Sequence, residues 1–493
     1  MTPKAPAKNK PGGDSLARGT IALISVQIAF MAGGYIIHFY LGRSLGPVQY
    51  GVFGVVITFL IWVEVSLTGG FPYAIRKFGA EKPESMSAIA RAAMRGQLIY
   101  SILLCIIAVA ASPWIAALLR DPSLTGFLRL ASLDIPIFAF YFAYNAVLNG
   151  KRLYSRQAIA MSMYAVTKVA AIILLVMLGF GIKGALVGNI IASAGGLMVA
   201  FLQVGRLQEA EPYPIRRLIS YSGATATLSV CFTLLISVDV FMVKAMSSIS
   251  AEVGYYTAAS TIARAPFYVF LGISMATLPV ISRAASESDN SLVRQYVRQA
   301  FRLHMLLLAP ITAIISGTAV GTVGLLYTNQ YSEAGPVLGI LITALMMFGF
   351  LHTLYNVMVA YGDTHTPVLG TTVLIILNVL GSVVLVPKMG ITGAAVAAII
   401  TSIIGFFVSS MICKRRLGVF IPLGSVIRIA FAAVVIYTVA RFIPLTGIEL
   451  VGLYIMLFLL YGVVLVVTGE IKRIDIDKVG AAIGLSRKIS KPA

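Results

Sequence analysis

Besides three histidines, five ionisable side chains lie inside long apolar stretches of the sequence. Two are cations, Lys168 and Arg264, and three are acids, Glu64, Asp134 and Asp239. Such a residue costs roughly 2.5–3.5 kcal/mol at the centre of a bilayer, so it usually faces a cavity or a charged partner. The cations can hold an anion such as a phosphate, and the acids can neutralise a cation or take up a proton or a sodium ion.

Arg264 is the strongest candidate for an anion ligand. Its guanidinium stays protonated and presents a planar fork that matches phosphate oxygens. It lies near the middle of an apolar segment, two residues before Pro266. The alternative is an ion pair with Glu64 or Asp239 that holds two parts of the fold together.

Lys168, Arg18 and Arg43 complete the predicted substrate-binding set. Lys168 lies in the middle of an apolar segment, and its alternative is an ion pair with Asp134. Arg18 begins the first apolar segment, where it can equally be an anchor on the positively charged side of the membrane. Arg43 lies at the far end of that segment, where it can instead fix the next turn by a hydrogen bond.

The acids and the histidines have weaker functional predictions. Glu64 and Asp239 are predicted to neutralise Arg264 or to bind a coupling ion, and Asp134 is predicted to pair with a charge. Histidine titrates near neutral pH, but a single histidine in a helix is more often a packing residue. We therefore expect packing roles for three: His38, His304 and His352.

Gly33, Gly34 and Pro266 are the predicted hinges, because helix kinks usually trace to proline or glycine. For the two glycines, close packing of neighbouring helices is an equal alternative.

The elements that position these residues are membrane-spanning helices. Of the 493 residues 59% are apolar and 11% are charged, and the mean hydropathy is +0.93. A soluble protein carries about 25% charged residues, so a soluble enzyme, a disordered chain and a secreted disulfide scaffold are excluded. We predict an all-α polytopic membrane protein with fourteen spans of roughly 20 residues each. They lie at about 18–41, 48–70, 96–119, 124–149, 157–180, 184–205, 218–245, 252–281, 303–327, 335–361, 366–387, 391–412, 424–443 and 448–469.

The net charge of +20 indicates a topology. With a cytoplasmic N-terminus, most of the 38 Lys and Arg fall on the cytoplasmic side, as positive loops favour. We therefore expect a multi-pass protein of the plasma (inner) membrane, with cytoplasmic tails at 1–17 and 470–493. The basic loops are expected to contact anionic lipids, and nothing in this pattern indicates nucleic acid.

No cofactor, metal or covalent catalysis is expected. The three cysteines, Cys105, Cys231 and Cys413, are scattered through apolar segments and show no metal-binding spacing. A Walker A sequence is absent, which argues against ATP hydrolysis by this chain.

An internal repeat divides the chain. Four landmarks recur at offsets of 203 to 211 residues: Gly51 and Gly254, Pro72 and Pro279, Tyr144 and Tyr355, and Gly184 and Gly393. Each half then holds six spans, so we predict an N-lobe at 18–205 and a parallel C-lobe at 218–412, with 424–469 added outside the repeat. Transporters built from such repeats place the substrate path between the lobes and alternate their access.

The segment from Gly42 to Gly51, GRSLGPVQYG, resembles the "R-x-L-G-P-x-x-Y/F-G" signature of Wzx-like polysaccharide exporters of the MOP superfamily. Tyr255-Tyr256-Thr257-Ala258-Ala259 followed by Pro279 is similar to the second-lobe counterpart. The resemblance extends over nearly the whole chain. It implies a flippase that moves an undecaprenyl-diphosphate-linked oligosaccharide to the outer leaflet, for exopolysaccharide, O-antigen or capsule synthesis. A membrane glycan polymerase is the implied partner.

Three rival functions remain at this point. One is a cation-coupled multidrug or metabolite antiporter of the MATE type, although no acid lies between Ile21 and Leu41. Another is a flippase for a peptidoglycan lipid precursor. A glycosyltransferase or polymerase is the third, although the predicted outer connections leave little room for a catalytic domain.

Overall fold

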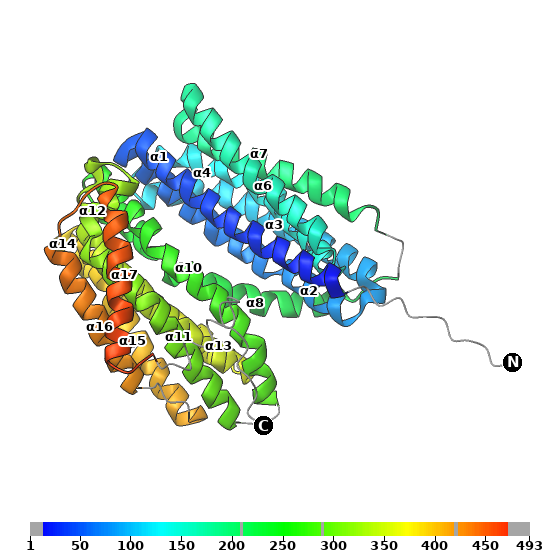
Figure 1. Ribbon diagram of the computed structural model, residues 1–493. Coiled ribbons are helices and arrows are strands. Elements are labelled where there is room, and N and C mark those ends of the chain that lie inside the picture. The colour runs from blue at the N-terminus through cyan, green and yellow to red at the C-terminus, as the bar shows by residue number, and fades with distance from the viewer. Residues whose placement is uncertain (1–12, 208–210, 287–289, 419–422, 472–493) are drawn as a thin grey trace, which may run out of the picture. The chain divides into compact units, whose positions relative to one another are not determined.

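The computed structural model describes residues 13–207, 211–286, 290–418 and 423–471, and every element in these ranges is a helix (Figure 1). This confirms the predicted all-α fold class. The helices are α1 Gly13–Gly69, α2 Phe71–Glu81, α3 Met86–Leu118, α4 Leu124–Ser132, α5 Asp134–Gly150, α6 Tyr154–Leu175, α7 Gly181–Val204, α8 Ile215–Leu235, α9 Val238–Met246, α10 Ser250–Ser286, α11 Asn290–Gly317, α12 Ala319–Leu326, α13 Ala334–Ala360, α14 His365–Met389, α15 Ile391–Leu417, α16 Leu423–Phe442 and α17 Glu449–Val467. Three short turns are η1 Pro83–Ser85, η2 Val176–Phe180 and η3 Asn329–Tyr331.

Helix α1 contains two of the predicted spans. It is 57 residues long, and a helix that crosses a bilayer needs only about 20 residues. The break lies at Gly46, whose φ of 70° and ψ of 171° are outside the helical region, and Pro47 follows. Glycine adopts a positive φ without the steric cost that a side chain brings. The residues of the exporter-like signature thus make the turn between the two spans.

The chain divides into two compact units at the Gly254–Tyr255 bond, which lies inside α10. The first unit contains α1 to α9 and the first turn of α10, and the second unit contains the remainder. Figure 1 shows α1, α6 and α7 running alongside one another in the first unit. The predicted lobe boundaries at 205 and 218 stay predictions.

Eleven helical segments in the described residues are long and apolar enough to cross a membrane. Two of them, Ile21–Glu81 with 61 residues and Tyr154–Val204 with 51 residues, each cover two predicted spans. The eighth predicted span, in α10, is not among the eleven. The predicted count of fourteen therefore stays a prediction, although each predicted span coincides with one or two helices.

Two helical hairpins show how the repeat is built. Helices α6 and α7 are joined at Gly181 (φ 53°, ψ −133°), and α14 and α15 are joined at Gly390 (φ 58°, ψ −143°). A side chain at either position would be strained. The two GxxGA sequences found in the repeat therefore form the same tight turn.

The first hairpin has one residue more than the second. The buried positions Tyr164, Ile172 and Val176 match Leu374, Ser382 and Val386 at an offset of 210, whereas the turn glycines differ by 209. The extra residue lies at η2, a five-residue π-helical turn in which Gly179 has a non-helical φ of 89°.

Candidate functional site

Lys168 is half-buried on α6 and lies against an aromatic ring. Its Nζ donates a hydrogen bond to the hydroxyl of Tyr164, one helical turn earlier, over 3.2 Å, and lies 5.4 Å from the ring centroid. Tyr164 is buried and stacks on Tyr141 of α5 at a centroid distance of 4.8 Å. The stack fixes the ring, so the ring holds the ammonium group at a defined depth in the first unit.

Asp134 is the first residue of α5 and is completely buried. Its Oδ2 accepts a hydrogen bond from Nδ2 of Asn189 on α7 over 2.8 Å. A carboxylate in the first turn of a helix also interacts favourably with the helix dipole. Lys168 lies within electrostatic reach of this carboxylate.

Glu64, half-buried on α1, joins the same group because its charge interacts with those of Lys168 and Asp134. We call Glu64, Asp134, Tyr164, Lys168 and Asn189 the Lys168 cluster. It contains two acids for one cation and connects α1, α5, α6 and α7. The structure therefore favours the interpretation of Lys168 as an internal charge partner, and its role as a substrate ligand stays a prediction.

Asp239 lies in the first turn of α9, directly after the break between α8 and α9. It is buried, and its Oδ1 accepts a hydrogen bond from the backbone N–H of Val240 over 3.0 Å. Trp62 of α1 approaches the same break: its Nε1 donates to Oγ of Ser237 over 2.7 Å, and its ring stacks on Phe241 at 4.3 Å. This aromatic and hydroxyl contact holds α9 on α1.

Arg264 lies on α10 in the second unit, half-buried, with its Nε shielded from solvent. Two residues later, Pro266 is buried, and α10 is helical throughout from Ser250 to Ser286. Arg264 therefore has the partial burial that an anion ligand at membrane depth requires. Both the ligand role of Arg264 and the hinge role of Pro266 stay predictions.

The remaining predicted residues are not members of the Lys168 cluster. Arg43 is exposed near the Gly46 turn, and Arg18 lies in the first turns of α1, where the side chains are outside the described residues. A Cβ on Gly33 would lie 3.1 Å from Cγ2 of Val169, whereas one on Gly34 would meet no atom within 4 Å. Gly33 thus fits the close-packing alternative, and the hinge role of both glycines stays a prediction.

The first unit also contains an apolar groove of about 620 Å³ between α1, α3 and α8, with Phe71 of α2 at one end. Phe59, Trp62, Phe71 and Tyr100 supply most of its aromatic surface, and α8 supplies small side chains such as Gly223. No residue of the predicted site lines it. Sequence reasoning missed the groove because three separate segments form it, and it missed Tyr164 and Asn189 because they carry no charge.

A comparison with protein families identifies the chain. The model of the family described as "Polysaccharide biosynthesis protein" matches residues 40–336, which is more than half of the sequence. The chain belongs to this family. This match confirms the resemblance that the sequence predicted. No curated protein matches the chain by sequence.

Solved structures show that this polysaccharide biosynthesis protein has the fold of MOP-superfamily transporters. A lipid II flippase MurJ in an inward-closed conformation matches with a TM-score of 0.73 and 16% identity, over 90% of this chain and 98% of the other. A MATE-family multidrug resistance transporter of the MOP superfamily, facing inward, matches with a TM-score of 0.67 and 17% identity, over 81% and 98%. An outward-facing structure of a MATE-family transporter matches with a TM-score of 0.61 and 21% identity, over 83% of this chain and 99% of the other. The protein is therefore a multi-pass membrane protein with a transporter fold.

Proposed function

We propose that the protein is a flippase for an undecaprenyl-diphosphate-linked oligosaccharide. It moves this lipid by alternating access from the cytoplasmic to the outer leaflet, for exopolysaccharide, O-antigen or capsule synthesis. The match of the polysaccharide biosynthesis family to residues 40–336 is the observation that carries this proposal. The fold shared with a lipid II flippase agrees with it.

The physical need for such a protein comes from the polar head group. Its hydroxyls and phosphates lose their hydrogen bonds to water if they enter hydrocarbon without a compensating partner, which costs several kcal/mol for each group. Arg264 supplies a permanent positive charge at membrane depth for the diphosphate, and Lys168 supplies a second one that Glu64 and Asp134 hold when no substrate is bound. Arg18 and Arg43 act at the cytoplasmic and outer ends of the path.

The membrane potential can drive the export step. One charge that moves across 100 mV changes its free energy by about 2.3 kcal/mol. The free energy of a diphosphate with about two negative charges therefore falls by roughly 5 kcal/mol when it leaves a negative interior. Glu64 and Asp239 are the residues through which a proton or a sodium ion would be coupled instead. The chemistry requires no bond to be made or broken, so the protein is a transporter and not an enzyme.

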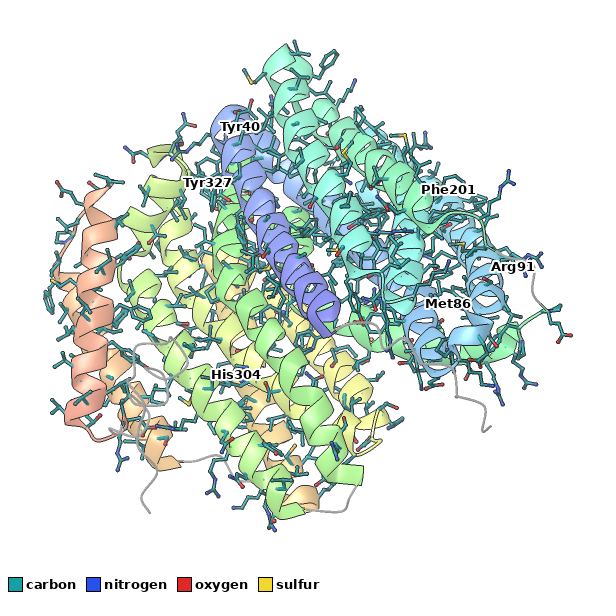
Figure 2. All side chains as sticks on the ribbon, turned by 45° about the vertical axis from the view of Figure 1, so that its right-hand side comes forward. Tyr40, Met86, Arg91, Phe201, His304 and Tyr327 are labelled. Atoms are coloured by element: carbon teal, nitrogen blue, oxygen red, sulfur yellow. The ribbon has the colours of Figure 1, made fainter. Side chains whose placement is uncertain are left out.

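The predicted topology accompanies this function. The protein lies in the plasma (inner) membrane with both termini in the cytoplasm, and a membrane glycan polymerase takes over the lipid-linked saccharide outside. The distribution of Lys and Arg supports this orientation. Figure 2 shows Met86 and Arg91 at one end of the first unit and Tyr40 at the other, so the proposed orientation assigns these two ends to opposite faces of the membrane.

Transport by reconstituted protein tests the proposal. Proteoliposomes receive a fluorescent lipid-linked saccharide, and a membrane-impermeant reagent measures how much of it reaches the opposite leaflet. Loss of one charged contact is worth about 1.5–3 kcal/mol, so Arg264→Ala should slow transport by about 10- to 100-fold. Arg441→Ala, which removes an exposed arginine from α16, is the control and should transport like the wild type. Equal rates for both variants would refute the site assignment.

A second candidate function, a cation-coupled antiporter, follows from the fold shared with MATE-family transporters. This function requires a titratable acid at membrane depth, and Glu64 and Asp239 are available. Efflux of a cationic dye against an imposed proton or sodium gradient, lost in Glu64→Gln or Asp239→Asn, would favour it. Transport of the saccharide without any dye efflux would exclude it.

A further inference from the structure

No residue of the proposed head-group path lines the apolar groove of the first unit. Its walls come from α1 between Phe59 and Gly70, from α3 around Tyr100 and from α8 between Ile219 and Leu234. In the predicted topology these segments are the cytoplasmic halves of three spans. A volume of about 620 Å³ is within the roughly 300–1,000 Å³ typical of pockets that hold small ligands.

The groove is open where side chains are small. Gly223 and Thr227 of α8 are exposed, one helical turn apart, and both line it. A Cβ on Gly223 would meet no atom within 4 Å, so this position faces empty space. Phe59 and Phe71 form a buried aromatic surface behind it. An apolar chain from the bilayer can therefore enter along α8 and lie against aromatic rings.

Cations lie next to one end of the groove on three of the helices that form it. They are Arg76 and Lys77 on α2, Arg91 and Arg95 on α3, and Arg216 and Arg217 on α8. The nearer cation of each pair lies within five residues of a lining residue of its own helix, which is roughly 8 Å along the axis. A groove that is apolar along its length and cationic at its end is complementary to an anionic amphiphile.

Aromatic contacts hold two of these cations, Arg76 and Lys77, in place. The Nζ of Lys77 lies 4.3 Å from the ring centroid of Tyr221 on α8, and Phe78 packs edge-on against the same ring at 5.7 Å. The guanidinium of Arg76 lies 5.0 Å above the ring of Tyr73, and its Nε is buried and has no hydrogen-bond partner in the described part of the chain. An incoming phosphate oxygen would supply the missing acceptor.

We infer that this groove binds the polyprenyl chain of a phosphate-bearing carrier lipid, with the phosphate held by the cations of α2, α3 and α8. The identity of this lipid rests on the proposed function. The site lies within the first unit and uses none of the residues assigned to the head-group path. It receives the carrier on the cytoplasmic side of the membrane before the saccharide is moved.

Photo-crosslinking tests the groove directly. The full-length protein is placed in phosphatidylcholine nanodiscs with undecaprenyl phosphate that carries a diazirine on its chain, and labelled peptides are identified by mass spectrometry. The expected labels fall on peptides that contain residues 59–71 or 219–234. Gly223→Leu and Thr227→Phe fill the groove and should each reduce this labelling at least fivefold.

A matched control is available in Gly126→Leu. Gly126 is exposed on α4 in the same unit, its Cβ would also meet no atom within 4 Å, and it does not line the groove. This variant should label like the wild type. Equal labelling of all three variants would overturn the inference, and so would equal labelling by a diacyl phosphatidic acid that carries the same diazirine.

Transport of the lipid-linked saccharide by the same samples separates the two proposals. Full transport in a variant that has lost the label would overturn the claim that the groove receives the carrier before transport, and it would leave the flippase function standing. Labelling of the groove in a wild-type protein that moves no saccharide would overturn the flippase function instead. The expected result is that labelling and transport fall together.

Discussion

Helices α6 and α14 hold corresponding places in the two repeats, yet only α6 carries a charge in its middle. Lys168 lies on α6 among two acids, and the matching buried position on α14 is Asn378. Neither amide atom of Asn378 has a hydrogen-bond partner in the part of the chain that the structure describes. Both helices end at the same glycine turn. The turn and the packing therefore define the hairpin, and only one of its two copies carries a charge at this position.

Removing the charge from α6 should have the largest effect. Lys168→Met leaves Glu64 and Asp134 without their cation. Breaking a buried ion pair costs about 3–5 kcal/mol, and because Lys168 is only half-buried we expect about 2–3 kcal/mol. The midpoint of SDS-induced unfolding measures this loss. Lys183→Met, at an exposed lysine of α7, is the control, and an equal shift in both variants would contradict the internal role of Lys168.

The second-largest effect should come from the turn that the two hairpins share. A Cβ on Gly393 would lie 2.3 Å from the carbonyl oxygen of Leu385, whereas the nearest atom to a Cβ on Gly184 would be Cβ of Phe180 at 2.9 Å. Overpacking costs about 1–3 kcal/mol, so Gly393→Ala should be the more destabilising change and Gly184→Ala the milder one. Thermal unfolding in detergent gives the order, and the reverse order would show that the two turns relax differently.

Replacing the buried amide of Asn378 should change the free energy of unfolding less, and in the stabilising direction. Asn378→Leu removes two polar atoms that make no hydrogen bond, so it should be neutral or stabilise the protein by up to about 1 kcal/mol. Asn189→Leu is the matched change in the first unit. It breaks the hydrogen bond to Asp134 and should destabilise the protein. If both variants shift the midpoint of SDS-induced unfolding in the same direction, the contrast between Asn189 and Asn378 is refuted.

The smallest effects concern two ion pairs in the connecting loops. Burial raises the pKa of Asp121, but hydrogen bonds from Lys244 and Ser123 outweigh it and leave the pKa below its ordinary value. Hydrogen bonds from Thr366 likewise lower the pKa of Asp363. A carboxyl whose pKa is lowered by folding stabilises the protein above its ordinary pKa, and this contribution is lost as the pH falls through the lowered value.

Asp121→Asn and Asp363→Asn should therefore lower the unfolding temperature slightly at pH 7, and this difference from the wild type should shrink as the pH falls through the lowered pKa of each carboxyl. Exposed ion pairs contribute about 0–1 kcal/mol. The Asp121–Lys244 pair is less exposed than the Asp363–Arg416 pair, so Asp121→Asn should have the larger effect. A pH-independent effect of either variant would show that the carboxylate charge is not what stabilises the loop.

Much of the fold was predictable from hydropathy and glycine. The predicted span at 335–361 coincides with α13, and the span at 366–387 lies within α14. Long apolar segments allow few alternatives in a membrane, because only a helix satisfies their backbone hydrogen bonds internally. The repeat was also visible, since the positions of Gly181 and Gly390 demand a residue without a side chain. These features depend on local sequence alone.

The site was predictable only where charge made it conspicuous. Lys168 and Asp134 were expected as partners, and the structure brings them into electrostatic reach. The sequence did not indicate the electrostatic interaction of Glu64 with Lys168, and the predicted pairing of Glu64 with Arg264 stays a prediction. Which faces of α1 and α6 meet depends on packing that no local pattern encodes. The same holds for Trp62 and Ser237, which are 175 residues apart.

The π-helical turn at η2 has a consequence for how such a gene evolves. Gly181 follows Lys168 by thirteen positions, whereas Gly390 follows Asn378 by twelve. A codon gained inside a regular helix would rotate everything after it by about 100°. The five residues of η2 take up that rotation locally. Positions of α7 and α15 that differ by 209, such as Asn189 and Ala398, are therefore both buried. Two copies of one hairpin can thus differ in length and in charge while both keep the same packing.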